Sequence, residues 1–101
     1  MTTDKIYISG RQLGLDIAKF VDNPDEIRFI LNELGADDLQ HTGPIMPRNW
    51  QNNLYLIFYS QDQKIGHGII ADRFILYQKK WWLSPRPVMD MIIKTLKLSV
   101  E

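Results

Sequence analysis

The side chains that most often carry out chemistry in proteins are few in this chain, and they are scattered. Its two histidines, His41 and His67, lie far apart in different sequence surroundings, and the absence of cysteine excludes thiolate nucleophiles and thiolate metal sites. No glycine-rich phosphate loop, HExxH pattern or nucleophile elbow occurs in the sequence. We therefore predict that the protein is not an enzyme and that it has no catalytic residue and no cofactor.

Two adjacent acids precede the first histidine. Asp37 and Asp38, together with His41, are residue types that can ligate a divalent metal ion. Adjacent acids ahead of a polar loop are more typical of a solvated surface, so we predict no metal site.

The second histidine lies between two glycines. Gly66, His67 and Gly68 belong to an apolar segment, 65–70, that predicts a strand. Glycines at alternate positions clear side chains from one face of a sheet, which suits a closely packed helix, a bulge, or a groove for a ligand or partner. A small enzyme built around His67 is the third functional hypothesis for this chain.

The densest concentration of charge is acidic. Between residues 22 and 38 the chain has six acids and a single base, Arg28. Acids on a rigid helix speed the association of a protein with a cationic partner, although the helix dipole alone also favours acids near a helix start. The predicted binding surface for a basic protein partner comprises Asp22, Asp25, Glu26, Glu33, Asp37 and Asp38.

An alternative binding site lies in the basic and aromatic segment 77–86. Aromatic rings stack on unpaired bases and cations attract phosphate, so a single-stranded nucleic acid is one candidate ligand. Trp and Arg are also enriched at protein interfaces, and plain packing would bury one tryptophan while the other covers a sheet edge. The residues of this alternative site are Tyr77, Lys79, Lys80, Trp81, Trp82 and Arg86.

The two ends of the chain carry opposite charge although the net charge is zero. Residues 1–63 have nine acids and five bases, whereas residues 64–101 have three acids and seven bases. The whole molecule is therefore not built as a polyanion binder, and each end favours a different partner.

Two helices are clearly indicated. Asn23 suits an N-cap, Pro24 the first helical position and Gly35 a left-handed residue after the end, which predicts a helix over 24–34. The second helix follows Pro87, and its apolar stripe is Val88, Met89, Ile92, Ile93 and Leu96.

A third helix is predicted over 11–21 from the spacing of its apolar residues. Residues 5–9 and 54–59 predict strands. Segment 73–83 predicts one long edge strand, because Gln78-Lys79 offers no Gly or Asn for a tight hairpin. A loop over 36–53, anchored by Trp50, completes the prediction.

The resulting order, strand-helix-helix-strand-strand-strand-helix, predicts a single α+β domain over residues 1–101. We expect an antiparallel three- to four-stranded sheet with helices packed on one face. The chain start lacks the features of a signal peptide, and the longest apolar run, Leu54–Tyr59, is too short for a membrane span. We therefore expect a cytoplasmic protein that does not bind membranes.

The function that best fits these features is that of a protein-binding module. Its concrete form would be a small bacterial inhibitor or immunity-type protein that blocks one partner with a basic surface by surface complementarity. This likeness is one of type, since no motif in the chain establishes a family. The alternative is a nucleic-acid-binding module that uses residues 77–86, and self-association through the edge strand is left open.

Overall fold

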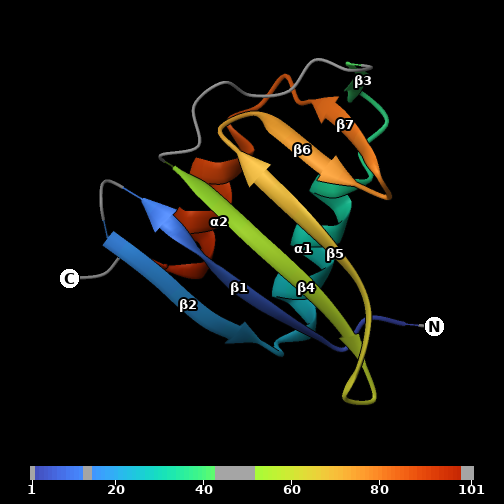
Figure 1. Ribbon diagram of the computed structural model, residues 1–101, viewed down its shortest axis with the longest axis vertical. Helices are drawn as coiled ribbons and strands as arrows, with labels where there is room; N and C mark the ends of the chain where they lie inside the picture. Colours follow the sequence, from blue (N-terminus) through green and yellow to red (C-terminus); the bar gives the residue numbers. More distant parts are fainter. Residues whose placement is uncertain (1, 13–14, 43–51, 99–101) are drawn as a thin grey trace.

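The computed structural model describes residues 2–12, 15–42 and 52–98, which form seven strands and two helices (Figure 1). In chain order these elements are β1 (Lys5–Gln12), β2 (Leu15–Val21), α1 (Pro24–Leu34), β3 (Gln40–His41), β4 (Asn53–Ser60), β5 (Gln63–Ala71), β6 (Phe74–Tyr77), β7 (Lys80–Leu83) and α2 (Val88–Leu96).

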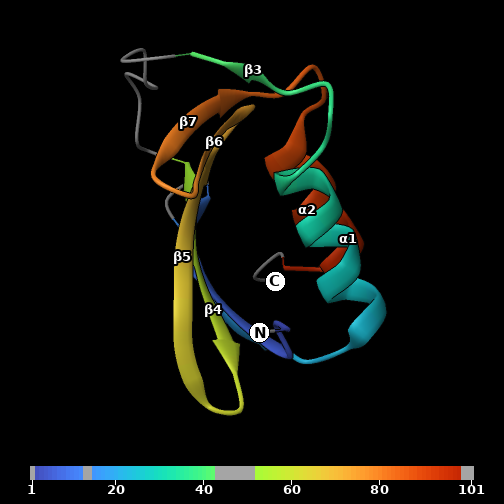
Figure 2. The ribbon, with the colours of Figure 1, turned by 90° about the vertical axis from the view of Figure 1, so that its right-hand side faces the viewer.

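The strands form one antiparallel sheet in the order β2-β1-β4-β5-β6-β7-β3. Both helices lie on the same face of this sheet, which curves around them, and no helix of residues 2–12, 15–42 and 52–98 lies on the other face (Figure 2). The predicted α+β class and the antiparallel sheet are confirmed. The predicted number of three to four strands is wrong, because three segments that we assigned differently each contribute one additional strand.

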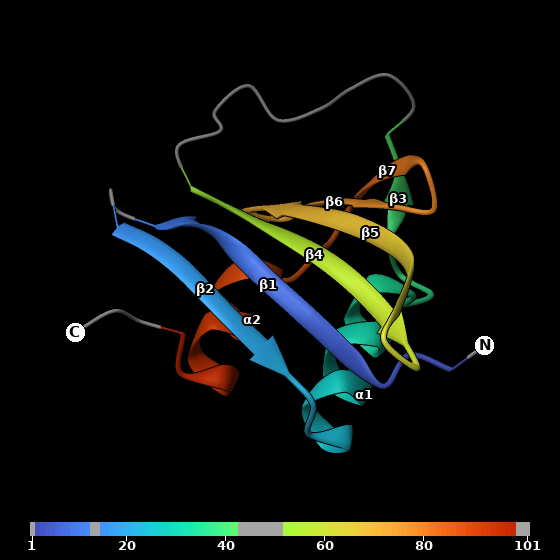
Figure 3. The ribbon, with the colours of Figure 1, turned by 60° about the horizontal axis from the view of Figure 1, so that its bottom comes forward.

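The first of these segments is 11–21, which was predicted as a helix and is mostly strand β2. Ile17 pairs with Gly10 and Val21 pairs with Ile6 of β1, so β1 and β2 form an antiparallel pair at one end of the sheet (Figure 3). Residues four apart, such as Ile17 and Val21, share a face in a strand as well as in a helix. Both are buried, whereas Phe20 is exposed, as a strand requires.

The second segment is 73–83, which was predicted as one long strand and is the β6–β7 hairpin. Gln78 and Lys79 form its two-residue turn with φ of 53° and 65°. Positive φ at both positions is the geometry of a type I′ turn, which normally selects Asn and Gly. The turn therefore forms against the local preference of its residues, whereas the Gln61-Asp62 turn between β4 and β5 has an aspartate, which tolerates positive φ, at its second position.

The two clearly indicated helices are confirmed. The Asn23 side chain caps α1 by accepting hydrogen bonds from the main-chain N–H groups of Asp25 (2.9 Å) and Glu26 (3.4 Å). Gly35 ends the helix with φ of −110°, so the left-handed conformation predicted for it is wrong. Within the described residues, neither helix is long and apolar enough to cross a membrane.

The core lies between the helices and the sheet. Along β4, Leu54, Leu56 and Phe58 are buried toward the helices, and α2 contributes Ile92 and Ile93. The predicted loop 36–53 contains strand β3, which pairs with β7, and Trp50 lies outside the described residues.

Candidate functional site

The predicted acidic surface is partly neutralised within the molecule. Arg28 pairs with Asp25 at 3.3 Å on the same helix. Arg86, which precedes α2, binds Glu33 at 3.0 Å and also binds Asp38. Because the Glu33 side chain is only 14% exposed, its charge is directed into this contact rather than toward a partner. Three of the six predicted acids are therefore engaged internally.

The other three acids of the set lie at the two ends of α1. Asp22 precedes the helix, Glu26 is in its first turn and Asp37 follows its end. Within the described residues none of them forms an ion pair. A helix of this length extends roughly 16 Å, so the remaining acids are divided between separate places.

Arg86 connects the two predicted sites. Its guanidinium, which donates a hydrogen bond to Asp38, lowers the pKa of that carboxyl below its ordinary value, and the two carboxylates in turn raise the pKa of Arg86. The turn before α2 is held by the buried Ser84 hydroxyl, which accepts the main-chain N–H of Arg86 at 3.1 Å. Arg86 is therefore committed to two carboxylates and is a poor candidate for a phosphate contact.

The remaining residues of the alternative site are divided between the two faces of the sheet. Tyr77 and Trp82 point toward the helices, Trp81 belongs to the opposite face, and Lys79 and Lys80 are exposed at the hairpin turn. The structure therefore does not gather the aromatic residues of segment 77–86 into one stacking surface.

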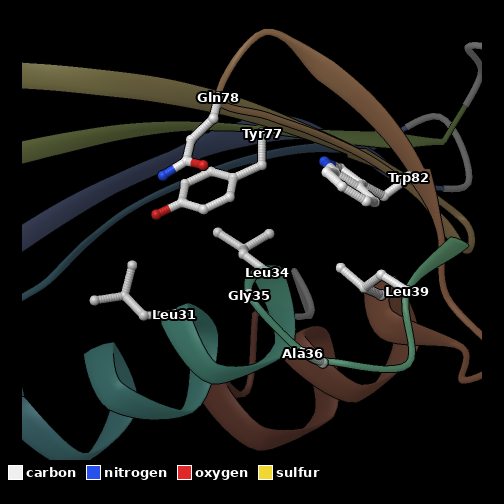
Figure 4. Close-up of a pocket in the computed structure, with 8 residues that line it drawn as sticks. All are labelled: Leu31, Leu34, Gly35, Ala36, Leu39, Tyr77, Gln78 and Trp82. Carbon is white, nitrogen blue, oxygen red and sulfur yellow. The ribbon is translucent and has the colours of Figure 1, made fainter. Parts of the chain in front are cut away.

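The two helix-facing rings line a pocket of about 380 Å³ beside the end of α1 (Figure 4). Tyr77 and Trp82 project from β6 and β7 toward Leu34 and Leu39, so segments from both predicted sites meet here. The described residues that line it are Leu31, Leu34, Gly35, Ala36, Leu39, Tyr77, Gln78 and Trp82. Leucine and aromatic side chains in this lining alternate with polar main-chain and side-chain atoms, so the pocket is of mixed polarity.

A second pocket, of about 360 Å³, lies on the other side of Tyr77. It is lined by Thr3, Phe58, Ile65, Gly66, His67, Tyr77, Gln78 and Lys79. Because both pockets share Tyr77 and Gln78, they flank the β6–β7 turn on its two sides. We name the second one the β5 pocket.

The alternate glycines of β5 lie on the helix-facing side of the sheet. Positions 66 and 68 pair with Phe58 and Leu56, which are buried there. A Cβ atom added at Gly66 would lie 3.7 Å from the Phe58 ring, so this ring covers the cleared area. The register shifts beside this point and leaves Ile65 as an extra residue, which confirms the bulge among the alternatives.

His67 has an exposed side chain on the opposite face of the same strand. Within the described residues, no three His, Asp or Glu side chains come together as a metal site would require. The structure therefore adds no partner group to the hypothesis of an enzyme built around His67.

The helix-free side of the sheet, which we name the open face, carries a row of apolar side chains. The register places Tyr55 of β4 beside Ile69 of β5, Ile69 beside Leu76 of β6, and Leu76 beside Trp81 of β7. Side chains directly opposite one another in neighbouring strands share a face. Tyr55 is 45% exposed although it belongs to an apolar strand.

A second row on the open face runs from Phe20 through Tyr7 to Ile57. Phe20 is 58% exposed, and its ring centroid lies 4.6 Å from that of Tyr7. The ammonium group of Lys5 lies 5.5 Å from the Phe20 ring centroid and 5.6 Å from that of Tyr59. Aromatic side chains from three strands thus meet on one accessible surface.

The sequence interpretation missed this open face. Segment 54–59 is apolar at every position, a pattern that is typical of a strand covered on both sides. The sequence signal for an exposed face was the alternation of Tyr55, Ile57 and Tyr59 with Leu54, Leu56 and Phe58. Tyrosine is common at partly solvated positions, because its ring is apolar and its hydroxyl is polar.

Comparisons with protein-family models, with curated proteins and with solved structures found no match to this chain.

Proposed function

We propose that this protein is a protein-binding module and that its partner covers the open face of the sheet. The observation that carries this proposal is the pair of apolar rows on that face, with Phe20 and Tyr55 substantially exposed. Contiguous exposed apolar surface on a soluble protein usually marks an interaction site. Exposed aromatic anchors are also the residues that most often dominate the energy of a protein interface.

The charges around this face favour a protein over a nucleic acid. Two cations of the open face are already paired, since Lys5 contacts Asp62 at 3.0 Å and Arg11 contacts Asp16 at 3.3 Å. A nucleic-acid platform needs cations that are available to phosphate in addition to stacking rings. Aromatic rings beside cations that are already paired with carboxylates are typical of protein–protein interfaces. We therefore propose a protein partner rather than a nucleic acid.

A small inhibitor or immunity-type protein is the concrete form that we propose for this module. Such a protein acts by covering its target with a rigid surface, and a sheet backed by two helices provides one. Helix α1 lies on the opposite side of the sheet from the open face (Figure 2), so the acids at its two ends are outside the contact that we propose.

The experiment is an affinity measurement with the purified partner, identified by crosslinking in the source cells. Replacing Tyr55 by serine should weaken binding by about 30-fold, as expected of an interface anchor worth roughly 2 kcal/mol. Lys94, exposed on α2, offers the control Lys94→Gln, which should bind as the unchanged protein does. If Tyr55→Ser and Lys94→Gln bind the partner with equal affinity, the open face is not the binding surface. If binding blocks the activity of the partner, the result supports an inhibitor.

A further inference from the structure

One half of β5 has a strand neighbour on only one side. The strand spans Gln63–Ala71, and β4 pairs along its length, but β6 pairs only with Gly68–Ala71. Within the described residues, the edge of segment 63–67 that faces away from β4 has no strand beside it. Figure 1 shows this lower half of β5 running past the end of β6. An unpaired strand edge is a template for the addition of another strand.

The hairpin register fixes which main-chain groups face this edge. Tyr77 and Lys80 close the two-residue turn and bond to each other, so the preceding residue, Leu76, directs its N–H and C=O toward Ile69 of β5. Alternate residues of a strand direct these groups to the same edge. His67, two positions before Ile69, therefore presents its main-chain N–H and C=O along the free edge.

The β5 pocket lies at this edge and opens beside a glycine. A strand added there would direct alternate side chains to the helix-facing side, next to Gly66, which has no side chain to obstruct them. The pocket there is bounded by the rings of Phe58 and Tyr77 and has a volume of about 360 Å³. The two rings and Ile65 give part of this pocket an apolar wall that suits an aromatic side chain, and polar residues line the rest of it.

Two exposed lysines lie at this edge. Lys64 belongs to the free segment of β5 and Lys79 lines the β5 pocket, and within the described part of the chain neither forms an ion pair. None of the eight residues that line the β5 pocket is acidic. An added segment would therefore be stabilised by carboxylates placed beside these lysines.

We propose that the free half of β5 binds an extended acidic peptide segment as an additional strand, with one large apolar side chain inserted into the β5 pocket. This inference rests on the proposed function, because it names the chemistry of one segment of the protein partner. The free edge of β5 and the open face are different surfaces, so an experiment can refute either proposal without refuting the other.

The test uses the purified protein and a fluorescein-labelled heptapeptide in which glutamate alternates with valine and a central phenylalanine. Fluorescence anisotropy measures binding, and amide hydrogen exchange reports on the strand edge. The expected result is saturable binding that slows exchange of the His67 amide. The same peptide with lysine in place of glutamate should bind at least tenfold more weakly, as charge complementarity requires.

Three variants separate strand addition from mere charge attraction. His67→Pro removes the edge N–H, while His67→Ala removes the same side chain and keeps that donor, so only the proline variant should lose about fivefold to tenfold in affinity. Gly66→Val should block the β5 pocket. The added Cβ would lie 3.7 Å from the Phe58 ring, and a thermal unfolding curve would verify that the variant is folded. Lys79→Gln should weaken binding, whereas Lys94→Gln should not.

The inference is overturned by an absence of binding, by equal affinity for the lysine peptide, or by affinities that the proline and valine variants leave unchanged. It is also overturned if the free edge pairs with a second copy of the chain and the protein dimerises without peptide. The Tyr55→Ser variant should bind the heptapeptide normally. If the unchanged protein binds its partner but does not bind the heptapeptide, the inference about β5 is wrong and the proposed function is unaffected.

Discussion

Replacing Gly10 by alanine should destabilise the fold strongly, because β1 and β4 approach each other closely at this position. A Cβ atom at Gly10 would lie 2.1 Å from the main-chain oxygen of Asn53 and 2.9 Å from the Cα of Leu54. Both atoms belong to the backbone of β4, which is held between β1 and β5 and cannot rotate away as a side chain could.

The magnitude follows from this overlap. Insertion of even small groups into a packed core costs about 1–3 kcal/mol, and a clash with backbone falls at the upper end of that range. For a domain of this size, a loss of about 3 kcal/mol lowers the melting temperature by roughly 12–24 °C. Thermal and urea unfolding, followed by circular dichroism, would measure both quantities.

The matched control is Gly66→Ala on β5. Its added Cβ would meet the nearest atom, in the Phe58 ring, at an ordinary 3.7 Å, and alanine restricts the unfolded chain more than glycine does. We expect this variant to be as stable as the unchanged protein or up to about 1 kcal/mol more stable. If the free energy of unfolding of Gly10→Ala lies within about 1 kcal/mol of that of the control, the close approach of β1 and β4 at this position is wrong.

Three further predictions address the hairpin, the helix cap and the Arg86 contacts. Substituting Asn-Gly for Gln78-Lys79 should raise the unfolding free energy by about 1 kcal/mol, since these residues accept the positive φ of both turn positions; a urea titration that shows a decrease would contradict the turn type. Asn23→Ala should cost about 1 kcal/mol by removing the α1 cap, and an unchanged urea midpoint would contradict the two cap hydrogen bonds. Arg86→Gln should destabilise the protein at neutral pH. Arg86 lowers the pKa of Asp38 in the folded state. The contact therefore stabilises the fold at pH values above the ordinary carboxyl pKa of 3.8, and this stabilisation is lost as the pH falls through the lowered pKa. The melting temperatures of the variant and the unchanged protein should therefore converge in acid. A difference that stays constant down to the lowest pH would contradict the contact.

Local sequence signals were sufficient where one physical rule acted alone. The cap at Asn23 and the proline after it specified where α1 begins, and the apolar stripe after Pro87 specified the face that α2 buries. Both signals depend on residues within two turns of one another, so no tertiary contact was needed to interpret them.

The sequence mispredicted the structure where the local pattern fitted two conformations and strand pairing selected one of them. Ile17 and Val21 fit a helix stripe and a strand face equally well, and only pairing with β1 selects the strand. Gln78 and Lys79 carry no preference for a type I′ turn, yet cross-strand pairing of Leu76 with Trp81 holds them in one.

The candidate site was predicted only in part. The acids from 22 to 38 do not form one free surface group, because two of them pair with Arg86. That pairing depends on the end of α1 lying beside the start of α2, which no local pattern encodes. The open face was missed for a similar reason. Whether Tyr55 is buried depends on which face of the sheet both helices pack against, and that depends on the apolar side chains of all the strands together.

Site-specific photocrosslinking in the source cells tests the central claim most directly. A photoreactive phenylalanine derivative would replace Tyr55 on the open face in one variant and Glu26 on α1 in another. We predict that the Tyr55 position gives a covalent adduct with one protein and that the Glu26 position gives little or none. An adduct formed from the α1 position alone, or no protein adduct from the open face, would contradict the account.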